Sequence, residues 1–419
     1  MYSLLCCVQS GLTSFSTRAR LFERVWLQDR IPAMKRNPLR MLAAACILAV
    51  GAGILVMIVK NNNAGGRDFI TYWVAGQQII HGKNPYDFTA ALPMERAVGF
   101  KLDHALVMRN PPIAFFMVLP LGFVSPNAGL VLWFIALLVS LMASIRMIWT
   151  MNGRPPDRLH LLGYCFAPLM ECIMAGQLGI FLLLGTTLFL YFHKTRPMLA
   201  GASLLLCAIK PHLFVPFGIV LLLWAITTRA YRILSGAGIA LAASGVLAFA
   251  VDPHAWSQYR EMMRTSGIMG EIVPTMSEML RLIVHRGVWV QFIPEAIGCC
   301  WAVWYFRTRR AHWDWMDQGL LVLLVSVLCS PYSLLPDESL LLPAVLTAAY
   351  RASDSGRSLV PFGIVAGVAM LEVFINIPMY TVYYVWTPLA WLGWYLYATR
   401  SKGAPAGEIR DEEAVAEQL

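Results

Sequence analysis

Asp68 has the side chain and the surroundings of a general base. It precedes Phe69, Tyr72 and Trp73, which recur at helical spacing. The run ends at Gly82, so the pattern predicts a short amphipathic helix lying along a membrane surface. A carboxylate at that place can accept the proton of an incoming hydroxyl group. An aspartate is also a common N-cap, so Asp68 could simply begin the helix.

Lys210, His212 and Arg109 are the basic residues best suited to hold a phosphate group. Lys210 ends an apolar run, and Pro211 fixes the turn between it and His212. A lysine at the end of an apolar helix could merely extend its ammonium group to water, whereas in a fixed turn it could bind phosphate. Arg109 stands before Asn-Pro-Pro, where a second surface helix is predicted to begin.

Two further polar turns are candidates for binding a substrate. The segment Ser330-Pro-Tyr-Ser-Leu-Leu-Pro-Asp-Glu338 separates two apolar stretches with two prolines and two carboxylates. Asp337 could cap the next helix, or it could face a cavity and help to hold an acceptor. Gly176-Gln177 stands at the predicted outer end of another helix, where a helix-terminal glycine explains it as well as a substrate contact does.

The chain that positions these residues has the composition of a multispanning membrane protein. Of its 419 residues, 58% are hydrophobic and 14% are charged, and the mean hydropathy is +0.60. These values exclude disordered, fibrous and disulfide-scaffold classes. The net charge of +9 comes from short basic clusters between hydrophobic segments, a topology signal that does not predict nucleic-acid binding. The nine cysteines lie mostly in apolar runs without metal-ligand spacing, and neither a metal nor a cofactor is predicted.

About twelve apolar stretches are candidates for helices that cross the hydrocarbon core. The predicted fold is therefore all-α, a polytopic helical membrane protein with surface helices in its first external loop. The stretches are centred near residues 41–59, 128–150, 160–175, 177–192, 197–209, 213–228, 233–251, 289–306, 318–330, 338–350, 359–376 and 381–398.

The distribution of lysine and arginine predicts the orientation. If the N-terminus is cytoplasmic, 22 of the 33 basic residues lie on the cytoplasmic side, and every short connection there carries some. Both termini are then cytoplasmic. The long loops 60–127 and 252–288 are external, and the candidate residues gather on that face of the cytoplasmic membrane.

The predicted organisation has three parts. A cytoplasmic arm over 1–40, with a possible start-site extension before Met34, precedes a transmembrane domain over 41–398 and a cytoplasmic tail over 399–419. The cytoplasmic connections are short basic turns without a Gly-rich phosphate loop, a nucleotide-binding domain or a DxD-like metal pair. This argues against a nucleotide-driven pump and against an enzyme that uses a nucleotide-sugar from the cytosol.

Taken in order, the motifs resemble one family. The succession is similar to that of the polyprenol-phosphate-mannose-dependent mannosyltransferases of glycosyltransferase family 87, in the GT-C class, and it runs from about residue 40 to residue 398. Many relatives carry an aromatic residue and a histidine where this chain has Leu334-Leu-Pro336, a departure that bears on the acceptor. The motifs are Asp68-Phe with Tyr72 and Ala75, Gly82-x-x-Pro85-Tyr86, Asn110-Pro-Pro followed by Pro120-Leu, Gly176-Gln177, Lys210-Pro211, and Ser330-Pro-Tyr-Ser with Asp337.

The resemblance implies an integral membrane enzyme that transfers a hexose, mannose in the relatives, from a polyprenyl-phosphate donor to a lipid-linked or cell-envelope glycan. The acidic residue of the first external loop is the family's expected general base, which here is Asp68. Because phosphate is already a good leaving group, one base and a cationic clamp suffice for inverting transfer. The clamp would be Lys210, with Arg109 and His212. The candidates for substrate binding are Tyr72, Gln177, Tyr332 and Asp337.

Two other classes stay open at this point. Twelve spans with both ends inside are also the layout of many secondary transporters, although no repeat relates the two halves and few ionisable residues lie within the spans. A lipid-linked glycan polymerase or ligase would use the same face and the same basic residues. The identity of the donor would distinguish these classes.

Overall fold

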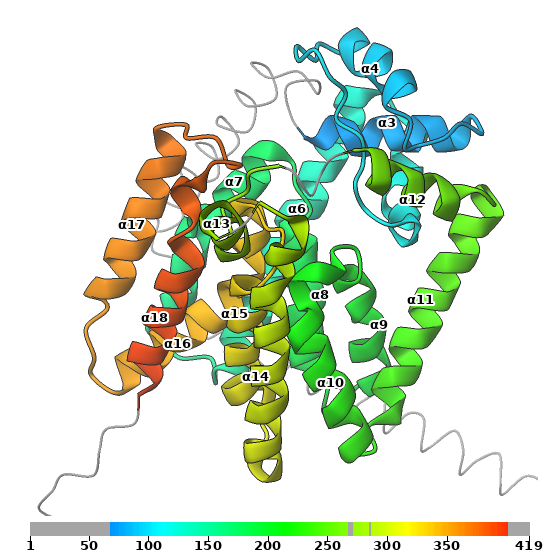
Figure 1. Cartoon of the computed structure of the whole chain (residues 1–419). Coiled ribbons are helices and arrows are strands. Elements are labelled where there is room, and N and C mark those ends of the chain that lie inside the picture. Colours follow the sequence, from blue (N-terminus) through cyan, green and yellow to red (C-terminus); the bar gives the residue numbers. More distant parts are fainter. Residues whose placement is uncertain (1–67, 267–270, 285, 401–419) are drawn as a thin grey trace, which may run out of the picture. The chain divides into compact units, whose positions relative to one another are not determined.

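The computed structural model describes residues 68–266, 271–284 and 286–400, where all regular structure is helical (Figure 1). The all-α expectation is confirmed for these residues. The chain divides into two units, Met1–Asn61 and Asn62–Leu419, and every described residue belongs to the second. The first apolar stretch and nearly all of the predicted terminal segments lie outside the described residues, so the division into an arm, a membrane domain and a tail stays a prediction.

The described residues form a series of α-helices. In chain order they are α3 (Phe69–Ile80), α4 (Phe88–Ala97), α5 (Phe115–Val118), α6 (Pro126–Met151), α7 (Ala167–Ala175), α8 (Gly179–Phe192), α9 (Pro197–Cys207), α10 (Val215–Thr227), α11 (Tyr231–Val251), α12 (Ala255–Thr265), α13 (Met276–Ile283), α14 (Ile293–Arg309), α15 (Leu320–Leu328), α16 (Leu342–Asp354), α17 (Val360–Phe374) and α18 (Thr387–Thr399).

Short helical segments with tighter or wider turns join or extend many of these helices. They are η2 (Pro112–Ala114), η3 (Leu119–Phe123), η4 (Leu159–Cys165), η5 (Pro211–Phe214), η7 (Val288–Phe292), η8 (Arg310–His312), the π-helical η9 (Trp315–Gly319), η10 (Leu335–Leu341) and η11 (Val382–Tyr384).

Each predicted apolar stretch within the described residues coincides with one helix or with two consecutive helical segments. Among the helices that the structure describes, only α6, with 26 residues, and α11, with 21, are long and apolar enough on their own to cross a bilayer. Several of the other helices have a proline in their first turn, where the missing N–H is tolerated and the helix begins. The predicted number of about twelve spans is therefore not confirmed by helix length.

The helix predicted after Asp68 exists as α3, but the prediction that it is an amphipathic helix lying on a membrane surface was wrong. Ten of its 12 residues are buried, so it has no broad face left for a membrane surface. It packs against η3, where the Trp73 indole donates to the Val124 carbonyl at 2.9 Å and the Gln77 amide donates to the Gly122 carbonyl at 2.7 Å. The second predicted surface helix is also present, as η2, α5 and η3, with prolines at its start.

The loop predicted over 252–288 contains two helices that sequence reasoning missed, α12 and α13. Figure 1 draws α12 just below α3, whereas α13 lies across the bundle near α7. The predicted first and second external loops therefore meet at α12. That contact is direct, because α12 packs against η2.

Helix α8 joins the candidate segments to the core. It packs against α6, α9 and η10, and ten of its 14 residues are buried. Its first residue, Gly179, lies so close to η10 that a Cβ atom there would stand 2.0 Å from the Pro336 carbonyl oxygen. The turn at Gly176-Gln177 and the turn at 330–338 are therefore held side by side.

Candidate active site

The Asp68 side chain does not cap the helix that it precedes. Its backbone is helical, and the carboxylate accepts no hydrogen bond from the first turn of α3. The backbone carbonyl of Asp68 accepts from Thr71 instead, at 3.1 Å from the amide and 2.8 Å from the hydroxyl. Because the carboxylate is thus free of any role in the helix, the capping interpretation of Asp68 was wrong.

The carboxylate of Asp68 points to Gln177, where α7 turns into α8. Gln177 Nε2 donates to Asp68 Oδ2 at 2.5 Å, and the Tyr72 hydroxyl donates to Gln177 Oε1 at 3.1 Å. Gly176, at φ +73°, ends α7 in the left-handed conformation that favours glycine, which confirms the predicted helix end. Gln177 is therefore both part of that turn and the residue that orients Asp68.

Trp133 of α6 supports this arrangement from behind. Its ring stacks on Tyr72 with centroids 5.1 Å apart, and its indole N–H donates to the Gly176 carbonyl at 2.8 Å. One side chain thus holds both the helix with Tyr72 and the turn with Gln177. Its aromatic and hydrogen-bonding contacts fix the distance between these two elements.

Lys210 and Asp337 form a buried ion pair. Lys210 Nζ lies 2.6 Å from Asp337 Oδ1, and their side chains are 11% and 0% exposed. Lys210 does not extend its ammonium group to water, so the snorkelling interpretation was wrong. The other carboxylate oxygen of Asp337 accepts from the Leu334 amide at 3.1 Å. Asp337 therefore stabilises the start of η10, as the capping alternative predicted, and also faces the predicted phosphate-binding lysine.

Arg109 lies beside these groups in a more open position. Its guanidinium donates twice to Glu271, at 2.6 and 2.5 Å, and once at 3.5 Å to the Tyr332 hydroxyl. The side chains of Arg109 and Glu271 are 32% and 39% exposed, so water reaches the pair. The Tyr332 ring in turn packs edge-on against His212, with centroids 5.9 Å apart.

Electrostatics connect these contacts into one cluster. Burial raises the pKa of Asp68 above its ordinary value, while the hydrogen bond from Gln177 and the charges of Lys210 and Arg109 act in the opposite direction. Burial and the neighbouring ammonium of Lys210 lower the pKa of His212 to about 4. His212 is therefore neutral at pH 7 and can donate or accept a hydrogen bond, and its Nε2 has no partner within the described residues. Its role in holding the phosphate stays a prediction.

A family model with the description glycosyltransferase family 87 matches residues 109–331, just over half of the chain. The chain belongs to glycosyltransferase family 87. The resemblance seen in the order of the motifs is thereby confirmed, and with it an enzyme that transfers a sugar and resides in a membrane. A secondary transporter is no longer an alternative. Comparisons with curated proteins and with solved structures give no match.

The matched range of this family 87 enzyme does not contain every candidate residue. Arg109, Gln177 and Lys210 lie within it, whereas Asp68 precedes it and Asp337 follows it. All five nonetheless belong to one cluster, because Gln177 bonds to Asp68, the charges of Lys210 and Arg109 act on Asp68, and Lys210 pairs with Asp337. The roles of Asp68 and Asp337 therefore depend on geometry and not on the family match.

Sequence reasoning missed two residues of the cluster, Glu271 and Trp133. Glu271 lies in a loop without a readable motif, and only the folded chain brings it to Arg109. Trp133 lies in an apolar stretch where an aromatic residue gives no signal of its own. A tryptophan in the helix after the first loop could have been noted, because its N–H needs an acceptor when the ring is buried.

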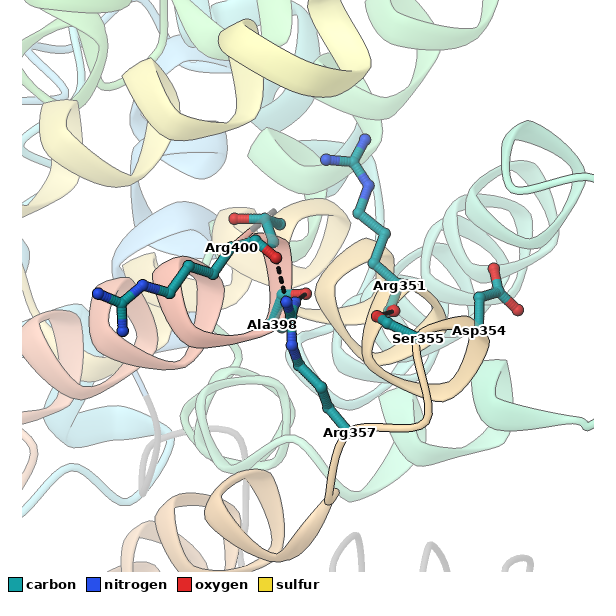
Figure 2. A pocket seen from close by; sticks show the side chains of 7 residues that line it. Arg351, Asp354, Ser355, Arg357, Ala398 and Arg400 are labelled. Atoms are coloured by element: carbon teal, nitrogen blue, oxygen red, sulfur yellow. Dashed lines mark hydrogen bonds between the residues drawn. The ribbon is translucent and has the colours of Figure 1, made fainter. Parts of the chain in front are cut away.

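The opposite end of the family 87 enzyme carries a separate small cavity of about 310 Å³, lined by Arg351, Arg357, Arg400 and four neighbours (Figure 2). Arg357 donates to the carbonyl of Ala398, at 2.7 Å, and to that of Arg400, which satisfies the last turn of α18. In Figure 2 the guanidinium groups of Arg351 and Arg400 point away from each other. These arginines do not converge on a common anion site.

The donor set of the cluster is of the kind that binds phosphate and sugar hydroxyls. Within residues 68–266, 271–284 and 286–400, no three His, Cys, Asp or Glu side chains are placed to share a metal ion. The cations that the site offers from its own side chains are Arg109 and Lys210.

Proposed function

We propose that this family 87 enzyme transfers a hexose, mannose, from a polyprenyl-phosphate donor to a hydroxyl group of a lipid-linked or cell-envelope glycan. The reaction takes place on the external face of the cytoplasmic membrane. The observation that carries the proposal is the position of the Asp68 carboxylate. It makes no bond to its own helix and is bonded to Gln177, in a cluster that also contains the buried Lys210 and the partly exposed Arg109.

Asp68 acts as the general base. It accepts the proton of the acceptor hydroxyl, whose oxygen forms a bond to the anomeric carbon while the bond from that carbon to the phosphate oxygen breaks. The phosphate leaves with the bonding electrons, and the configuration at the anomeric carbon is inverted. A pKa raised by burial suits this step, because it makes the carboxylate a stronger base than an ordinary aspartate. Gln177 is the positioning residue that orients it.

The donor phosphate binds at Arg109 and Lys210. Arg109 is the accessible cation, and its two N–H groups that now hold Glu271 have the spacing that a phosphate also accepts. Lys210 is buried and paired with Asp337, so it supplies a fixed positive field for the developing phosphate charge. His212, neutral at pH 7, offers its Nε2, which has no partner within the described residues, as a hydrogen-bond donor in the tautomer that carries the proton there.

The sugar and acceptor hydroxyls bind to the remaining polar groups of the cluster. Tyr72, Gln177, Tyr332 and Asp337 are the candidates. Tyr72 and Gln177 are bonded beside Asp68, Tyr332 accepts from Arg109, and Asp337 pairs with Lys210. Tyr332 is protonated at neutral pH, because burial raises its pKa to about 12, so its hydroxyl is a hydrogen-bond donor. The acceptor itself is defined only as a glycan with a free hydroxyl group.

The identity of the donor tests this function. Purified enzyme in liposomes is incubated with radiolabelled polyprenyl-phosphate mannose, with a lipid-diphosphate glycan or with a nucleotide-sugar, and the Asp68→Asn variant serves as the matched control. We expect consumption of the polyprenyl-phosphate sugar alone, and only by the unmodified chain. Consumption of the lipid-diphosphate glycan would instead make the enzyme a glycan polymerase or ligase.

A further inference from the structure

Helix α13 has its polarity inverted relative to a helix on a water-soluble surface. Its buried side chains are Ser277, Glu278 and Arg281, whereas Ile283 is 76% exposed. Met276 and Leu282 are exposed as well. The helix therefore turns its charges inward and its apolar side chains outward.

The buried charges of α13 are satisfied inside the protein. Glu278 accepts from Arg281 at 2.9 Å from Nε and 2.6 Å from the terminal nitrogen, and the Gln291 amide also donates to it. A buried carboxylate and a buried guanidinium are costly unless paired in this way. Since the polar face is fully committed to the protein, the outward apolar face is a built feature and not the result of a helix that failed to dock.

The exposed apolar surface continues beyond α13. Val284 and Trp289 follow it, exposed to 65% and 63%, and Ile297 and Trp304 continue the series on α14. The same character marks α11, which is long and apolar enough to cross a bilayer and exposes Val246 and Phe249. The outward face of α13 thus has the same exposed apolar character as the helix surfaces that a membrane enzyme presents to lipid.

Helix α12 provides the contrast within the same loop. Trp256 is its one exposed apolar residue, whereas Ser257, Arg260, Glu261 and Arg264 are exposed and polar, and Arg264 pairs with Glu261 in the open. Such a surface belongs in water. The two helices of one loop therefore face different media.

We infer that α13 lies in the membrane interface on the side of the candidate active site, with its apolar face against lipid acyl chains. Eight residues of α-helix extend about 12 Å, which is too short to span a bilayer but suits a helix lying in its plane. Trp289, just beyond the helix, is of the type that prefers the level of the lipid headgroups.

This placement sets the depth of the phosphate clamp, a consequence that rests on the proposed function. The Ser277 hydroxyl donates to the Cys329 carbonyl at 3.3 Å, directly before the turn that carries Tyr332. Tyr332 is in turn bonded to Arg109. A helix fixed at headgroup level would hold these residues where the phosphate of a membrane lipid lies.

Photo-crosslinking to lipid tests the inference. The full chain is placed in nanodiscs that contain phosphatidylcholine with a diazirine in its acyl chain, irradiated and analysed by peptide mass spectrometry. We expect lipid adducts on Ile283, Val284 and Trp289, and none on the peptide of α12 that carries Ser257 to Arg264. An Ile283→Asp variant should lose most of the lipid adducts on residues 276–289. The matched Ser257→Asp variant should keep them.

Three results would overturn the inference. The absence of adducts on α13, when α6 and α11 are labelled, would place it in water. If adding polyprenyl phosphate removed the adducts, this surface would be a binding site for the polyprenyl chain of the donor. Crosslinks between two copies of the chain in place of lipid adducts would make it a dimer contact. Each readout is independent of transferase activity, so failure here is distinct from failure of the proposed function.

Discussion

The carboxylate of Asp68 is bonded to the side chain of Gln177, 109 residues further along the chain, and not to the helix that Asp68 precedes. Asp68→Asn should therefore abolish transfer and leave the fold intact. Asparagine still offers an oxygen to Gln177 but cannot take a proton, so kcat should fall by about 10²–10⁴-fold. Initial rates of sugar transfer and the thermal unfolding midpoint are the measurements.

Asp87 provides the matched control in the same loop. Its carboxylate does cap a helix, accepting from the amides of Thr89 at 2.8 Å and Ala90 at 3.3 Å. Asp87→Ala should cost about 0.5–2 kcal/mol of stability and leave kcat unchanged. If Asp68→Asn resembles Asp87→Ala, with stability lost and turnover kept, then Asp68 is only structural.

Gln177→Leu should move the acidic limb of the pH profile of kcat/KM to higher pH. Asp68 works only when deprotonated, and the hydrogen bond from Gln177 favours that form and so lowers its pKa. Removing the bond raises the pKa, and activity is then lost at a higher pH as the solution is acidified. Tyr72→Phe is the control, since it removes the other bond of Gln177 but keeps the one to Asp68. A limb that stays in place or moves to lower pH contradicts the role of Gln177.

Much of this site could be predicted from sequence because its members sit at helix ends marked by glycine or proline. Gly176 and Pro211 fix the turns that carry Gln177 and Lys210, and local chemistry of this kind is readable from order alone. The pairing of residues that lie far apart in the sequence could not be predicted. The partner of Arg109 is Glu271, 162 residues away, and nothing in the residues around either one specifies the other.

The same limit applies to the environment of whole helices. The apolar residues of α3 were interpreted as one face of a surface helix, yet η3 and α6 cover the remaining faces and bury it almost completely. In α13 the outward apolar residues are separated by Glu278 and Arg281, which pair with each other inside the protein, and Gln291 from another segment also donates to Glu278. Periodicity shows which residues share a face, but not which face meets protein, water or lipid.

The buried pair of Lys210 and Asp337 allows structure and function to be separated. Lys210→Met alone leaves the Asp337 carboxylate buried without its cation, which should cost about 3–5 kcal/mol of stability. Asp337→Leu alone leaves the buried ammonium and should cost a similar amount. The double variant removes both charges, so most of that loss should be recovered. Thermal unfolding in detergent measures all three.

Transfer by the double variant then decides the role of Lys210. If Lys210 stabilises the donor phosphate, the double variant should keep a lowered kcat/KM for the donor even though its stability is restored. The opposite outcome, wild-type turnover once stability returns, would show that Lys210 serves only to neutralise Asp337.

Substituting Arg109 and substituting Glu271, which form a partly exposed pair, should change KM for the donor in opposite directions. Arg109→Ala removes charge-assisted hydrogen bonds worth about 1.5–3 kcal/mol, and KM for the donor should rise by about 10–100-fold. Glu271→Gln weakens a competitor for the same guanidinium. Because the pair is partly exposed and worth at most about 1 kcal/mol, KM should fall by about two- to fivefold. Steady-state kinetics with polyprenyl-phosphate mannose measures both.

Glu261→Gln is the control for this last pair, since Glu261 also accepts two bonds from an arginine, Arg264, on the exposed side of α12. It should leave KM unchanged. A rise in KM for Glu271→Gln, equal in direction to that of Arg109→Ala, would mean that the carboxylate holds Arg109 in its working position. Glu271 would then be a positioning residue of the clamp, and the phosphate would bind beside the pair without displacing it.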